Sequence, residues 1–141
     1  MDKPNSNMAK QVALAAIAFE QQNTGRAPKS VTAVMSGETL VVTLHGLLSP
    51  AERALAKSAA GAAQVQEFHQ ELFTSALDSL RQDIKRITGV EVREATVEVD
   101  ATSGTVVKAF TSGTVVQMFL LTDSVATESW SGNGNGMVVQ P

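Results

Sequence analysis

The chain has 141 residues and contains no cysteine and two histidines. The lack of cysteine excludes disulfides, thiol nucleophiles, iron–sulfur clusters and cysteine-bound zinc. Two histidines are too few for a metal site built from three. The sequence also lacks a serine-hydrolase elbow, a phosphate-binding loop, an HExxH motif and a calcium loop. We therefore expect a protein without metal or cofactor that is not an enzyme.

A basic excess and long apolar runs are missing too. The 11 basic and 14 acidic residues give a formal net charge of -3, which argues against nonspecific binding of nucleic acid. The longest apolar run, Val12 to Phe19, has eight residues, whereas a membrane-spanning helix needs about 20. The polar segment 1–7 does not resemble a secretory signal. We expect a cytoplasmic protein without direct membrane insertion, which a partner can hold at a membrane.

Apolar residues make up 43% of the chain, enough for a packed core, and their spacing predicts two helical segments. The first begins near Met8, carries an apolar stripe and ends at Gly25. The second begins at Ser49-Pro50-Ala51-Glu52, a capping box with proline in the first turn. It continues to Ile87, with a break or kink expected within residues 58–63. An uninterrupted helix over 64–87 would be roughly 36 Å long.

Four strands are predicted between and after these helices. Residues 31–35 and 40–44 read as a hairpin, because Ser36-Gly37-Glu38 has the composition of a turn. Residues 94–100 alternate between apolar and polar, and residues 106–110 return after a Ser103-Gly104 turn. The order αββαββ predicts an α+β domain with an antiparallel sheet of four or five strands and helices packed on one face.

A tandem repeat follows the fourth strand. Residues 102–110 and 111–119 are identical at seven of nine positions. One interpretation is a local duplication that adds a turn and a strand; the other is that two similar segments compete for one place in the sheet. We expect an apolar edge strand that pairs with another copy of the chain. Its candidate contact residues are Val115, Val116, Met118 and Leu120. The domain is expected to cover residues 1–121, with a flexible tail rich in Gly, Asn and Ser over 122–141.

Three residues are candidates for contact with a ligand or partner. Arg26 lies between Gly25 and Pro28, which constrain the loop that carries it. His45 ends the second predicted strand. We expect Arg26, Pro28 and His45 to form the contact, while an exposed arginine in a surface turn is the alternative. The other histidine, His69, has no carboxylate at a recognisable motif spacing and is expected to be structural.

The segment Gly25-Arg26-Ala27-Pro28-Lys29-Ser30-Val31 resembles the GRGP-x-S-V signature of the MpsC-like family. The similarity continues through Leu40 to Ala56, with its Leu-Ser-Pro-Ala-Glu segment, and through Ile87-Thr88-Gly89-Val90. It covers residues 8–110, departs from the signature at Ala27, and excludes the tandem repeat and the tail. The family is named for a sodium-translocating system that generates a membrane potential. The resemblance implies an accessory or regulatory role and assigns no catalytic residue.

Three classes of function fit these observations. The first is a small soluble, non-catalytic accessory module that binds a membrane-protein partner. The second is a structural protein that assembles into oligomers or filaments through the repeated strand. The third is a sensor of a small anion that uses Arg26. We expect a homo-oligomer, with a dimer as the simplest case.

Overall fold

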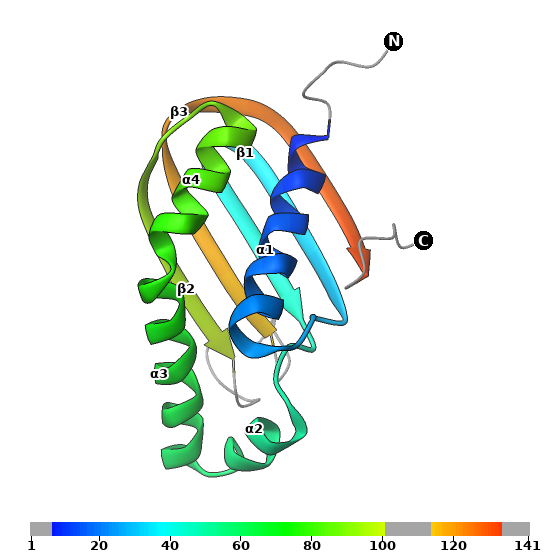
Figure 1. The fold of residues 1–141 in the computed structure, drawn as a ribbon, viewed down its shortest axis with the longest axis vertical. Coiled ribbons are helices and arrows are strands. Elements are labelled where there is room, and N and C mark those ends of the chain that lie inside the picture. The colour runs from blue at the N-terminus through cyan, green and yellow to red at the C-terminus, as the bar shows by residue number, and fades with distance from the viewer. Residues whose placement is uncertain (1–6, 101–113, 134–141) are drawn as a thin grey trace.

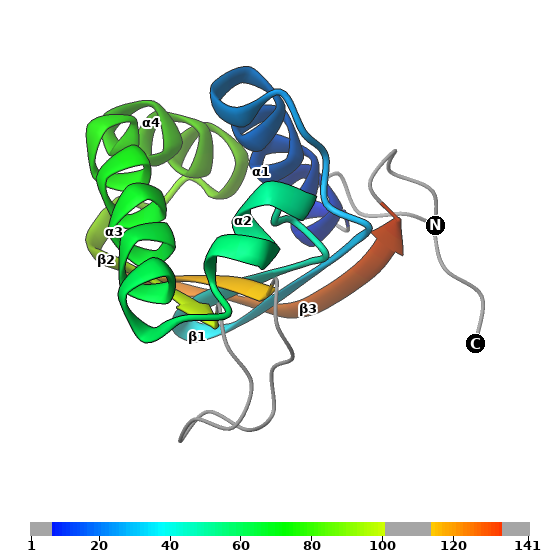
Figure 2. The same cartoon turned by 90° about the horizontal axis from the view of Figure 1, so that it is seen from below.

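The computed structural model describes residues 7–100 and 114–133. In chain order the elements are α1 (Met8–Thr24), β1 (Ser30–His45), α2 (Pro50–Leu55), α3 (Ala59–Ser75), α4 (Leu77–Thr88), β2 (Val92–Asp100) and β3 (Thr114–Asn133). The strands form one antiparallel sheet in the order β1-β3-β2, and the helices lie on one of its faces (Figure 1, Figure 2). The predicted α+β class is confirmed. The described residues form three strands rather than the four or five expected.

The first predicted hairpin is confirmed within β1. The backbone N–H of Lys29, just before β1, donates to the carbonyl of His45, its last residue, at 2.7 Å, whereas a straight strand of 16 residues would hold its ends about 50 Å apart. β1 therefore turns back near Gly37, whose φ of 58° is a left-handed conformation that favours glycine. The register against β3 shifts on both sides of Gly37. The buried residues are Val31, Ala33 and Met35 before the turn and Leu40, Val42 and Leu44 after it.

The long strand β3 pairs with both halves of β1. Residues 128–133 of β3 pair with the first half of β1, and residues 115–120 pair with its second half. Between these halves, β3 has more residues than β1 and bends (Figure 1). β3 therefore curves around the turn of β1.

The predicted edge strand is in fact the centre of the sheet. Residues 115–120 of β3 pair with β1 on one side and with β2 on the other. Val115, Val116, Met118 and Leu120 therefore do not offer a free backbone edge, and the edge-strand prediction is wrong. The returning strand predicted at residues 106–110 lies outside the described residues. The domain boundary predicted at residue 121 is also wrong, since β3 continues to Asn133.

The long helix predicted over 64–87 is divided into α3 and α4. The break is at Ala76, whose φ of -112° and ψ of 13° depart from helical values. The break expected within residues 58–63 lies just before them: α2 ends at Leu55, and α3 begins at Ala59 with Ser58 as its N-cap. Dividing the longer helix lets α3 pack on β2 and α4 pack beside α1.

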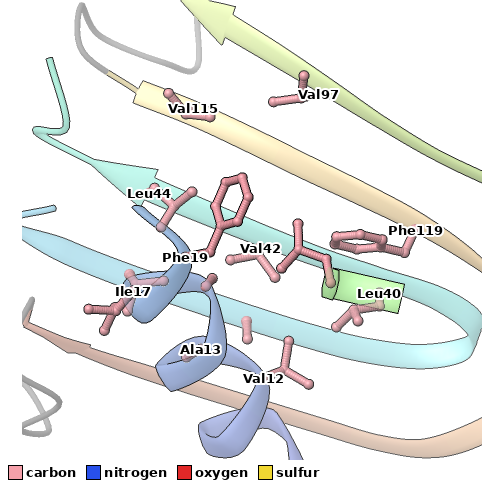
Figure 3. Close-up of a cluster of buried hydrophobic side chains, with 14 of the residues drawn as sticks. Val12, Ala13, Ile17, Phe19, Leu40, Val42, Leu44, Val97, Val115 and Phe119 are labelled. Atoms are coloured by element: carbon pink, nitrogen blue, oxygen red, sulfur yellow. The ribbon is translucent and has the colours of Figure 1, made fainter. Parts of the chain in front are cut away.

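The hydrophobic core fills the layer between the helices and the sheet (Figure 3). Its largest fully buried side chain is Phe119 of β3, whose ring centroid is 5.9 Å from that of Phe73 on α3. On the opposite face of the sheet, the described helices cover nothing (Figure 2). There Met118 and Leu120 are 41% and 36% exposed. The sheet therefore has one buried face and one open, partly apolar face.

Candidate functional site

The three contact residues predicted from the sequence lie at one end of the domain. After Gly25 ends α1, the loop to β1 runs beside the loop that leaves β1. The backbone N–H of Lys29 donates to the His45 carbonyl at 2.7 Å, and Arg26 Nε donates to the Leu47 carbonyl at 3.4 Å. The fold thus places Arg26 and Pro28, on the loop before β1, close to His45 at the end of β1, as a common contact site requires.

Exposure separates these three residues. Arg26 is exposed, His45 is half-buried and Pro28 is buried. Pro28 therefore shapes the loop, whereas the Arg26 guanidinium is accessible to a partner. Its Nε bond to Leu47 orients the group and leaves further N–H donors for a carboxylate or another anion. A ligand or partner at this end of the domain stays a prediction.

A second group of polar residues, missed in the sequence, comes from the first three helices. Glu20 lies on α1, Glu52 on α2 and His69 on α3. His69 Nε2 is 3.0 Å from Glu52 Oε2. His69 is 4% exposed and Glu20 is 2% exposed. We call Glu20, Glu52 and His69 the buried acid–histidine cluster.

The capping box predicted at the start of α2 is confirmed, and it belongs to this cluster. Ser49 Oγ accepts a bond from the Glu52 backbone N–H, and Glu52 Oε1 accepts one from the Ser49 backbone N–H at 2.9 Å. The other carboxylate oxygen of Glu52 binds His69. Glu52 therefore begins α2 and joins it to α3. No motif spacing pointed to this pair, because the fold brings the carboxylate from 17 residues earlier in the chain.

Glu20 has the most unusual environment in the cluster. Its Oε1 is buried and has no hydrogen-bond partner among the described residues. Burial and, to a smaller extent, the negative charge of Glu52 together raise the pKa of Glu20 from 4.5 to about 7. Both causes favour the protonated, neutral form. Near neutral pH, the protonated and ionised forms of Glu20 are therefore both present in the folded protein.

The sequence contained a signal for Glu20. Glu20 follows Ala16 by four positions and Ile17 by three, which places it on the buried face of α1. A carboxylate on an apolar stripe is unusual, because burial without a partner is costly. No sequence pattern, however, links Glu20 to Glu52 or His69, since the three residues come from separate helices.

Within residues 7–100 and 114–133, no helix is long and apolar enough to cross a membrane. No three acidic or histidine side chains there are grouped so that they could hold a metal ion. The buried acid–histidine cluster is therefore not arranged as a metal site.

Comparison with known proteins identifies the family of this chain. Residues 5–113 match the family described as "Na+-translocating membrane potential-generating system (MpsC)". The chain is also similar to the uncharacterised protein YbcI of Bacillus subtilis (strain 168). The two are 26% identical over 104 residues, which cover 74% of this chain and 84% of YbcI. No solved structure gives a significant match. Because the family match covers residues 5–113, most of the chain, the chain belongs to the MpsC family.

Proposed function

We propose that this protein is a small non-catalytic accessory protein that regulates a membrane ion-translocating system by binding one of its proteins. In this proposal it is cytoplasmic and reaches the membrane through that partner. The family description supplies the link to sodium translocation. The buried acid–histidine cluster and the exposed Arg26 loop provide the structural arguments.

The burial of His69, which is bound to Glu52, is the observation behind the non-catalytic part of the proposal. A histidine bound to a carboxylate is a common acid–base arrangement in enzymes. Here His69 is 4% exposed, and each oxygen of Glu52 already accepts a hydrogen bond. A general base must reach the proton that it removes. This pair instead supports the junction between α2 and α3.

Arg26 is the side chain that we assign to partner binding. It is exposed on a short loop whose course is set by Gly25, by buried Pro28 and by the Lys29–His45 bond. A fixed guanidinium recognises a carboxylate with two parallel hydrogen bonds. We therefore propose an acidic segment of a membrane protein as the partner, contacted by Arg26 and His45. A small anion at the same guanidinium is the alternative outcome of the test.

The experiment is affinity capture from detergent-solubilised membranes, followed by reconstitution with the purified membrane protein that is captured. Wild type, Arg26→Ala and Arg93→Ala are compared; Arg93 is an exposed arginine on β2 and serves as the matched control. We expect Arg26→Ala to weaken binding at least tenfold and Arg93→Ala to leave it unchanged. If no integral membrane protein binds, or if Arg26→Ala binds like wild type, the proposal is wrong. A melting shift with phosphate or sulfate that Arg26→Ala abolishes would favour the anion sensor.

A further inference from the structure

The short helix α2 is attached to the domain mainly at its two ends. None of its residues, Pro50–Leu55, is buried. Buried Leu47 and Leu48 precede it, and buried Ala56 follows it. Between these anchors, the side-chain bond that joins α2 to another helix is the one from Glu52 to His69. Whatever weakens this bond loosens α2 without disturbing the core.

Glu52 ties that bond to the local structure of α2. Its two oxygens accept from the Ser49 backbone N–H and from His69. The same side chain therefore caps α2 and fastens it to α3. If Glu52 moves away from its place, α2 loses its capping box and its link to α3 together.

Glu20 is the group that can act on Glu52. It is buried on α1, and its Oε1 lacks a partner among the described residues. When both carboxyl groups are ionised, their charges repel, and the burial of Glu20 limits how far water can screen that repulsion. One histidine, already bound to Glu52, cannot neutralise two carboxylates. The relief available to the fold is to keep the proton on Glu20 or to let Glu52 move out.

Other charged groups on the elements packed against α1 have different partners or positions. On α4, Arg81 donates to the Val92 carbonyl, Lys85 pairs with Glu91, and Arg86 pairs with Asp83. On β3, Glu128 accepts from the Ala9 backbone N–H at the opposite end of α1. On β1, Glu38 is exposed, His45 is half-buried and its carbonyl accepts from Lys29. Buried Gln117 on β3 is neutral. Glu52 is the charge that acts on Glu20.

We propose that Glu20, Glu52 and His69 form a proton-controlled latch for α2. With the proton on Glu20, Glu52 stays bound to His69 and α2 is held against α3. When Glu20 loses its proton, the repulsion from Glu20 weakens the Glu52–His69 bond and α2 opens more often. The pKa of Glu20, about 7, places this change between about pH 6 and pH 8.5. The latch does not depend on the accessory role proposed above.

The test is amide hydrogen exchange of residues 50–56 in the full chain at pH 6.0 and 8.5, expressed as protection factors so that the intrinsic effect of pH is removed. We expect the protection of α2 in wild type to fall about tenfold, the factor that corresponds to one pKa unit of coupling. The amides of β3, in the centre of the sheet, serve as the internal reference. Glu20→Gln should keep α2 equally protected at both pH values. Glu67→Gln, which changes an exposed glutamate of α3, should behave like wild type.

Two results would overturn the latch. One is an α2 whose protection in wild type does not depend on pH; the other is a Glu20→Gln protein with the same pH dependence as wild type. If Glu20→Gln does not fold, wild type alone gives the answer by NMR titration. The Glu20 side-chain carboxyl and the α2 amides must then share one midpoint, and separate midpoints would reject the proposal.

Discussion

Removing the charge of Glu20 should stabilise the protein at alkaline pH and leave it unchanged at acidic pH. The pKa of Glu20 is about 7 in the folded protein, against 4.5 as its ordinary value. Below pH 4.5 the carboxyl group is protonated in both states and contributes no difference. Between pH 4.5 and 7 it ionises only in the unfolded state, so the free energy of unfolding falls as the pH rises. Above pH 7 the carboxyl group is ionised in both states, so this loss in the free energy of unfolding, the penalty, has reached its full size.

The size of this penalty follows from the pKa shift. About two and a half pKa units correspond to roughly 3 kcal/mol. For a domain of this length, that corresponds to about 10 °C in melting temperature as an upper bound. Glu20→Gln removes the penalty, because an amide has no proton to lose in this pH range.

The assay is urea unfolding of wild type and Glu20→Gln at pH 5, 6, 7 and 8. Any fixed effect of the amide appears equally at every pH, whereas the charge effect grows with pH. We expect the stability difference between the two proteins to increase by about 2 to 3 kcal/mol from pH 5 to pH 8. Glu67→Gln, on the exposed face of α3, should show no such increase. The reasoning fails if the difference for Glu20→Gln is the same at pH 5 and pH 8.

Three other substitutions test the packing and the open face of the sheet. Gly61→Ala should cost about 1–3 kcal/mol in urea unfolding, because a Cβ there would lie 1.8 Å from the Leu55 carbonyl oxygen; Ala60→Gly, exposed in the same helix, is the control. Val116→Pro should abolish the native circular dichroism, since β3 is paired on both sides and proline cannot donate to either neighbour; a folded variant would contradict the central position of β3. If the expected dimer forms through the open sheet face, Met118→Glu should give a monomer by light scattering, because Met118 is 41% exposed there. An unchanged mass in Met118→Glu would place the interface elsewhere.

The ends of the helices could be predicted from the sequence because they depend on neighbouring residues. Gly25 ends α1 in a left-handed conformation, as expected, and Gly89 ends α4 in the same way. The capping box of Ser49 and Glu52 begins α2. Each signal spans four residues or fewer, so the local chain contains the information that is needed.

The turn of β1 could be predicted in the same way, but its pairing with β3 could not. Ser36-Gly37-Glu38 has the composition of a turn, and Gly37 does adopt a positive φ. The partner of both halves of β1 is β3, which begins at Thr114, far along the chain. Interpreting residues 122–133 as a tail hid half of β3.

The buried acid–histidine cluster shows a different limit of prediction from the sequence. Each residue had a sufficient local explanation: Glu52 caps a helix, His69 lies beside an apolar stripe, and Glu20 is one polar residue in an amphipathic helix. Their chemistry arises only where α1, α2 and α3 meet. Replacing such a buried polar group with a well-packed apolar one is often neutral or stabilising, so stability alone does not require Glu20. A carboxyl group that lowers the stability of its own fold near pH 7 does give one property that leucine would not. It makes the attachment of α2 depend on a proton. Hydrogen exchange measures this dependence, and urea unfolding measures the loss of stability that comes from ionising Glu20.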